Sequence, residues 1–190
     1  MEELKARIVA EGKVLGDSIL KVDRFLNHQI DPGLMKRIGQ EFANSFAKLR
    51  VSKIITIESS GIAPAVMTGL ALDVPVIFIR KKKPSTAQGK VYTADVYSYT
   101  KKETNMIYIE EELLTPNDRV LIIDDFLANG EAALGLAHLV KQSGAHIVGI
   151  GVVIEKAFQQ GHQLLENAGY QVRALASITS LTNGHIQFIE

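Results

Sequence analysis

The feature that most constrains the fold is a regular alternation of strand-length apolar runs with helical segments. Residues 53–57, 74–79, 119–124 and 146–154 are rich in Val, Ile and Leu and have the length of buried strands. Helical segments are expected at residues 64–72, 131–143 and 161–168, with Gly144 and Gly169 as stop signals. Strands that are apolar on both faces and alternate with helices predict an α/β fold with a mostly parallel sheet.

One long stretch departs from this alternation. Residues 80–112 begin with basic side chains and carry Pro and Gly, and two alternating segments follow at residues 90–99 and 104–110. This pattern is typical of a mobile loop on a hairpin. Residues 1–11 mix Glu and Lys with scattered apolar side chains, lack the apolar core of a secretory signal, and are expected to form a helix. A chain of 190 residues with these elements suits a single domain.

Composition excludes several classes of function. Lys and Arg total 21 and Asp and Glu also total 21, so no global positive field attracts nucleic acid or an anionic membrane. The absence of cysteine rules out disulfides, thiolate metal sites and cysteine nucleophiles, and it fits a reducing compartment. No apolar run reaches the roughly 18 to 20 residues of a membrane span. We therefore expect a soluble, cytoplasmic protein without a metal site built by the protein alone.

The most informative segment is residues 120–132, where two carboxylates precede a turn of small residues and a helix. Asp124 and Asp125 end the predicted strand, and Ala128, Asn129 and Gly130 lead into Glu131 and Ala132. In open α/β sheets, ligands bind at the carboxyl ends of strands, and a helix start offers free N–H groups to a phosphate. Adjacent carboxylates can accept hydrogen bonds from ribose hydroxyls. The segment predicts a site for a phosphorylated ribose, although a bare Asp pair before Asn-Gly is more often a solvated turn.

A second small polar turn follows the first predicted strand. Ser59, Ser60 and Gly61 stand between residues 53–57 and the helix expected from Pro64. Alone, this turn is weak evidence, because Ser-Ser-Gly is commonly a plain connection. Arg80 and Lys81 follow the second strand, where positive charge could meet a diphosphate; a solvated basic run is the competing interpretation, above all for the lysines at 82 and 83.

Taken together, these segments resemble type I phosphoribosyltransferases, and the likeness to the bacterial xanthine phosphoribosyltransferases extends over nearly the whole chain. The similarity is carried by residues 20–32, the two turns and Ile154-Glu155-Lys156. The resemblance implies that residues 128–132 bind the 5-phosphate, that residues 59–61 bind the diphosphate, and that Asp124, Asp125, Arg80 and Lys81 serve catalysis. It also implies Mg²⁺ carried by the diphosphate, a flap over about residues 80–110, a hood from about residues 1–35 and 156–190, and a homodimer.

The same resemblance assigns the base site to Leu20, Asn27 and Lys156. An apolar wall, an amide and a cation would suit the 2,6-dioxo edge of xanthine, because the donors of Lys cannot accept a hydrogen bond from the amino group of adenine. Without the resemblance, the preferred interpretation would be that Lys156 is a solvent-exposed lysine at a strand end and that Phe158 packs in the core. The expected activity is therefore transfer of phosphoribose from phosphoribosyl pyrophosphate to xanthine.

The chain departs from the common family pattern at two points. The phosphate turn often ends in Thr-Gly-Gly-Thr, whereas residues 129–132 are Asn-Gly-Glu-Ala, so backbone N–H groups must replace hydroxyl donors. The hypoxanthine-guanine branch has an acidic residue where this chain has Ala128.

Three alternatives to this reading stay open. An adenine or hypoxanthine-guanine phosphoribosyltransferase is the nearest, and a purine-sensing regulator on the same fold is a second, although the charge balance argues against nucleic-acid binding. The third is a phosphoacceptor domain using Asp124-Asp125, which would leave residues 128–132 without a role.

Overall fold

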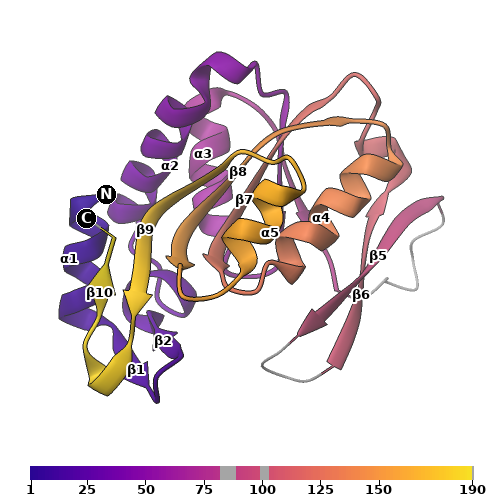
Figure 1. Cartoon of the computed structure of the whole chain (residues 1–190). Helices are drawn as coiled ribbons and strands as arrows, with labels where there is room; N and C mark the ends of the chain where they lie inside the picture. Colours follow the sequence, from indigo (N-terminus) through magenta and orange to yellow (C-terminus); the bar gives the residue numbers. More distant parts are fainter. Residues whose placement is uncertain (82–88, 99–102, 190) are drawn as a thin grey trace.

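The computed structural model describes residues 1–81, 89–98 and 103–189, and its core is a six-stranded sheet in the order β10-β9-β8-β7-β3-β4 (Figure 1). Only β10 is antiparallel to its neighbour. The prediction of a mostly parallel sheet is confirmed. The strands are β3 (Lys53–Ile57), β4 (Val76–Ile79), β7 (Arg119–Leu127), β8 (His146–Lys156), β9 (Val172–Ser180) and β10 (Gln187–Phe188).

Helices cover both faces of the sheet, as Figure 1 shows. One apolar core unites α1, α2 and α3 with one face, and a second unites α4, α5 and the β5–β6 hairpin with the other. A small hairpin, β1–β2, and a single π-helical turn, η1 (Asp23–Asn27), complete the part that precedes α2. The bounds are α1 (Glu2–Glu11), β1 (Lys13–Leu15), β2 (Ile19–Lys21), α2 (Pro32–Phe46), α3 (Ile62–Leu72), β5 (Val91–Ser98), β6 (Glu103–Glu110), α4 (Glu131–Gln142) and α5 (Gly161–Asn167).

Two predicted strand ends were too early. β7 continues past Asp124 to Leu127, and β8 continues past Ile154 to Lys156, because the two strands remain paired at Phe126↔Ile154 and Leu127↔Glu155. Asp124 and Asp125 therefore lie within β7 rather than at the end of the strand. The predicted hairpin is confirmed as β5–β6, while the parts of the predicted flap at residues 82–88 and 99–102 lie outside the described residues.

Glycines in β8 allow α2 to pack closely on the sheet. A Cβ at Gly149 would lie 2.6 Å from Phe46, and one at Gly151 would lie 2.8 Å from Phe42. The aromatic rings of α2 therefore occupy the space that strand side chains would fill. This packing accounts for the Gly149-Ile150-Gly151 sequence inside β8.

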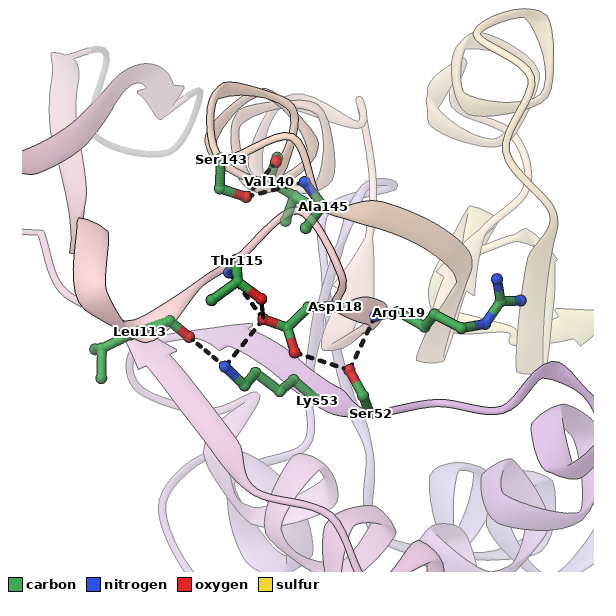
Figure 2. A network of polar contacts seen from close by, with 9 residues as sticks. All are labelled: Ser52, Lys53, Leu113, Thr115, Asp118, Arg119, Val140, Ser143 and Ala145. Carbon is green, nitrogen blue, oxygen red and sulfur yellow. Dashed lines mark hydrogen bonds and ion pairs between the residues drawn. The ribbon is translucent and has the colours of Figure 1, made fainter.

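At the amino ends of the parallel strands, a polar network centred on Asp118 joins the sheet to its loops (Figure 2). One carboxylate oxygen accepts from Ser52 Oγ (3.0 Å), and the other accepts from Lys53 Nζ (3.0 Å) and from the N–H and hydroxyl of Thr115 (2.8 and 2.9 Å). Burial raises the pKa of Asp118, but these hydrogen bonds outweigh it and hold the pKa below its ordinary value. The network therefore fastens β3 to β7 at the edge opposite the candidate site.

The same view shows how α4 ends. Ser143 Oγ donates to Val140 O (2.7 Å) and accepts from the N–H of Ala145 (3.2 Å), so the hydroxyl caps the last turn. Gly144 follows with φ 76°, which confirms it as the stop signal. Within the described ranges, no helix combines the length and apolar character needed to cross a membrane.

Candidate active site

The candidate site lies where the strand order reverses. From β3 the chain proceeds outward to β4, whereas from β7 it proceeds the other way to β8 and β9. Such a reversal leaves a crevice at the carboxyl ends of the two central strands. The two predicted turns, residues 59–61 and 128–130, follow these strands, so the topology brings them to one edge.

Two adjoining cavities occupy this edge. One has a volume of about 330 Å³ and the other about 170 Å³. Four residues line both: Tyr97, Asp124, Phe126 and Ala132. The larger cavity is further lined by Ile57, Glu58, Ser59, Ser60, Lys81, Val96, Asn105, Ile107 and Asp125. The smaller is further lined by Leu127, Ala128, Asn129, Gly130, Glu131, Ala133 and Val152. The acidic pair therefore stands between the two loops.

The two adjacent carboxylates have different environments. Asp124 is 4% exposed, and its Oδ1 accepts from the backbone N–H of Asp125 (2.9 Å). Burial, and then the negative charge of Asp125, raise the pKa of Asp124 well above its ordinary value. Asp125 is only half-buried, and its carboxylate accepts from Phe126 N–H (2.9 Å) and from Asn27 Nδ2 (3.0 Å). Ionisation is therefore less favourable for Asp124 than for an ordinary aspartate, while the carboxylate of Asp125 accepts two hydrogen bonds.

The loop after β3 rests directly on this pair. A Cβ at Gly61 would lie 2.2 Å from Thr56 Oγ1 and 2.9 Å from Asp124 Oδ1, so only glycine fits there. The peptide bond between Glu58 and Ser59 is cis. Ser59 is exposed and Ser60 is half-exposed, and both line the larger cavity. Hydroxyls and backbone N–H groups at the start of α3 are therefore available to an anion.

The loop after β7 is supported from below by the first residue of α5. Gly161 N–H donates to Ala128 O (3.0 Å), and a Cβ at Gly161 would lie 2.8 Å from Gly130 N. Gly130 itself has φ 92°, a conformation that glycine adopts without strain. Asn129, Glu131 and Ala132 line the smaller cavity with these residues. The predicted phosphate turn is a tight backbone loop at the start of α4.

The two predicted cations are not equally placed. Lys81 lines the larger cavity, and its backbone N–H donates to Glu58 Oε1 (2.8 Å). Arg80 is exposed, forms an isolated β-bridge with Tyr108, and does not line either cavity. The lysines at 82 and 83 lie outside the described residues. Of the described pair, the structure brings Lys81 to the acidic residues and leaves Arg80 beside the hairpin.

Of the three predicted base-binding residues, Asn27 of η1 contacts the acidic pair, and none of the three lines either cavity. Asn27 Nδ2 donates to Ser60 Oγ (3.3 Å) as well as to Asp125. It therefore links the loop after β3 to the end of β7. Lys156 Nζ donates to Ser18 O (2.8 Å), and burial lowers the pKa of Lys156. Leu20 is 6% exposed and belongs to the core shared with α1 and α2.

Several residues that line the cavities were not predicted, and Phe126 is one of them. Phe126 lines both cavities, and the Nζ of Lys156 lies 5.7 Å from the centre of its ring. Taken alone, the sequence would place Phe158 in the core, whereas Phe158 is 39% exposed. A signal existed, because Phe126 directly follows the acidic pair. Its pairing partner Ile154, two residues before Lys156, became evident only from the register.

Comparison with known proteins places the whole chain in context. The family model described as a phosphoribosyl transferase domain matches residues 24–182. A xanthine phosphoribosyltransferase of Geobacillus thermodenitrificans is 58% identical over 190 residues, covering 100% of this chain and 98% of that protein. One from Bacillus mycoides is 59% identical over 190 residues, covering 100% of this chain and 96% of that protein. The adenine phosphoribosyltransferase structure from Rhodothermus marinus superposes with a TM-score of 0.76 at 23% identity, over 94% of this chain and all of that one, which is a likeness of fold.

Proposed function

The chain belongs to the phosphoribosyltransferase family, and we propose that it transfers the phosphoribosyl group of phosphoribosyl pyrophosphate to xanthine. The products are xanthosine monophosphate and diphosphate, as purine salvage requires. One observation carries the proposal. The carboxylates of Asp124 and Asp125 separate two backbone loops, each at a helix start and each lining its own cavity. A sugar with a phosphate at one end and a diphosphate at the other fits that arrangement.

The reaction is a displacement at the anomeric carbon of the ribose. A purine nitrogen forms a bond to this carbon and releases its proton to solvent, while the bond to the diphosphate oxygen breaks and its electron pair leaves with the diphosphate. Lys81 and the loop of Ser59, Ser60 and Gly61 receive that negative charge. Positive charge on the sugar favours the ionised form of Asp124, whose proton is held more tightly in the free protein. Arg80 stays a candidate for the diphosphate.

The choice of base follows from the donors near Phe126. Lys156 offers only donors, which suit an oxo group of xanthine and cannot accept from the amino group of adenine. Asn27 can both donate and accept, although its Nδ2 is already shared between Ser60 and Asp125. The named relatives support xanthine, whereas the adenine enzymes share only the fold. Leu20 contributes an apolar surface from the core side.

Magnesium would enter this site on the diphosphate rather than in a ready-made cage. Within the described residues, no group of three or more His, Asp or Glu side chains could hold a metal ion. The larger cavity nevertheless has carboxylate oxygens of Asp124, Asp125 and Glu58 on its wall, and Mg²⁺ commonly binds one or two carboxylates together with substrate phosphates. When bound, the ion would offset the charge of the diphosphate.

We further propose a homodimer, supported by an apolar patch on the outer edge of the sheet. Val66 and Leu70 lie one turn apart on α3 and are 44% and 74% exposed, and Phe78 on the edge strand β4 is 48% exposed. Phe78 points to the same face as Val76, against which α3 packs at Gly69. A patch of this kind on an edge strand is suited to a partner. Light scattering should give twice the 20.8 kDa mass of one chain, and Leu70→Lys should give the single mass.

The decisive test is turnover with phosphoribosyl pyrophosphate and each of xanthine, guanine, hypoxanthine and adenine in parallel. We expect the highest kcat/KM with xanthine and no turnover with adenine. A preference for adenine would remove the assignment of the base. Calorimetry that detected binding of neither phosphoribosyl pyrophosphate nor a purine monophosphate would remove the enzyme assignment itself.

A further inference from the structure

A further buried carboxylate, besides those of Asp118 and Asp124, lies beside the base of the phosphate loop and has no part in the reaction above. Glu155 is 3% exposed at the carboxyl end of β8. Its Oε1 lies 2.6 Å from His162 Nδ1, and its Oε2 accepts from Ser177 Oγ (2.6 Å). Both carboxylate oxygens are therefore engaged by short hydrogen bonds to other elements, α5 and β9. His162 also faces Glu166 of its own helix, with Nε2 3.3 Å from Oε1.

The sheet register places this carboxylate beside the base of the loop. Glu155 pairs with Leu127 of β7 on one side and with Ser177 of β9 on the other. Leu127 is the last residue of its strand, so the loop begins at the next residue, Ala128. Glu155 therefore belongs to the layer of the sheet from which residues 128–132 project.

A second connection reaches the loop through α5. Gly161 precedes His162, donates to Ala128 O (3.0 Å), and packs so closely that a Cβ on Gly130 would lie 3.1 Å from Gly161 Cα. The contact between loop and helix is made by backbone atoms, which no side chain can adjust. A displacement of α5 would therefore displace the loop, and the bond from His162 to Glu155 ties the start of α5 to β8 in addition to the core packing of Leu165.

We propose that Glu155, acting through His162, is a positioning residue for the ribose 5-phosphate site, one that holds α5 against the backbone of residues 128–130. The inference rests on the proposed function of residues 128–132. The loop lacks the hydroxyl side chains that could bend toward a phosphate, so its N–H groups must already point at the anion. A shift of α5 would move those N–H donors and weaken binding of the 5-phosphate. The loop after β3, which is proposed to bind the diphosphate, would stay in place.

The test compares two ligands, ribose 5-phosphate and inorganic diphosphate, by calorimetry on the full chain. For His162→Ala we expect affinity for ribose 5-phosphate to fall about tenfold, and affinity for diphosphate to stay within about twofold. His162→Asn should recover most of the loss, because its amide can donate from nearly the position of Nδ1. In turnover, KM for phosphoribosyl pyrophosphate should rise with little change in kcat. Glu155→Gln should give a smaller loss of the same kind, since its amide can still bond both partners.

A matched control is a buried carboxylate at the opposite edge of the sheet. Asp118→Asn should lower the midpoint of thermal unfolding without changing the affinity for ribose 5-phosphate. If wild type binds ribose 5-phosphate and His162→Ala binds it equally well, the positioning role is wrong. Equal losses for both ligands would also overturn it, because they would indicate general damage. If wild type binds neither ligand, the proposed function fails first.

Discussion

Two aspartates that are adjacent in the sequence are chemically unlike in the structure. Asp124 is buried beside Gly61, while Asp125 faces the cavity and is held by Asn27. Ionising a buried carboxyl group next to another carboxylate costs free energy in the absence of ligand. In the proposed reaction, this cost would be offset when the sugar develops positive charge.

We predict that Asp124→Asn stabilises the free protein above acidic pH and impairs turnover about a hundredfold. The folded pKa of Asp124 is raised above its ordinary 3.8, so the unfolded chain releases the proton first. Stability therefore falls as pH rises from that ordinary value through the folded pKa, and the asparagine variant lacks this fall. Thermal unfolding between pH 5 and pH 8 should show a higher midpoint for the variant at the upper end. An unchanged pH profile would contradict the assigned environment.

Asp125→Asn provides the contrast at the neighbouring position. Its side chain is half-exposed, so we expect a large loss of turnover with little change in the midpoint of thermal unfolding. Wild-type turnover in this variant would show that Asp125 does not bind the ribose hydroxyls as proposed.

A second prediction concerns the ammonium group of Lys156. Lys156→Met keeps the apolar stem over Phe126 and removes every donor, so kcat/KM for xanthine should fall roughly ten- to a hundredfold. The matched control is Lys141→Met, since Lys141 Nζ lies 5.3 Å from the ring centre of Tyr170 and neither residue lines the two cavities. The control should keep wild-type kinetics. If both variants behaved alike, Lys156 would not read the base.

At the scale of elements, local pattern predicted those parts in which pattern and burial agree. The β-branched run of Lys53–Ile57 is β3, and the segment that begins at Glu131 is α4. Helix α2 and strand β9 were not assigned from the sequence, and the aromatic rings of α2 pack where β8 has glycines. That complementarity joins residues about a hundred positions apart, and no local window contains it.

The candidate site was predictable in its loops and not in its contacts. The small-residue turns at residues 59–61 and 128–130 lie where their spacing placed them. The contacts between side chains depend on the register of the sheet. This register brings the ring of Phe126 to the ammonium group of Lys156 and places Glu155 beside Leu127. The separation of Arg80 from the cavity follows from its bridge to β6, which depends on tertiary structure.

The loop after β3 allows a prediction about close packing. Gly61 has φ −69°, which alanine also adopts, so Gly61→Ala should act only through its clash with Thr56 and Asp124. We expect the free energy of unfolding to fall by about 1 to 3 kcal/mol and diphosphate affinity to fall about tenfold. The control is Gly33→Ala, whose new methyl group would meet only flexible side-chain ends at 3.3 Å. Equal diphosphate binding in the two variants would contradict the fit described for this loop.

At the scale of the whole molecule, the two ends of the sheet have opposite electrostatic roles. The carboxyl ends carry Asp124, whose ionisation is unfavourable without ligand, and the amino ends carry Asp118, whose ionised form is held by Ser52, Lys53 and Thr115. The polar network of Figure 2 fastens the strands at their amino ends, opposite the candidate site. The stabilising network and the candidate binding site therefore lie at opposite ends of the strands. Stabilisation at one end allows the site at the other end to hold an unfavourable charge.

This division predicts a distinct acid response. The folded pKa of Asp118 lies below its ordinary 3.8, so its contribution is complete above that value and is lost as pH falls through the folded pKa. Asp118→Asn should lower the free energy of unfolding at neutral pH by roughly 1.5 to 3 kcal/mol and flatten its decline below pH 4. Urea unfolding at a series of pH values measures both effects. Because the network lies at the amino ends of the strands, xanthine turnover per folded molecule should be unchanged in Asp118→Asn. A loss of turnover in the fully folded variant would show that the two ends of the sheet are not independent.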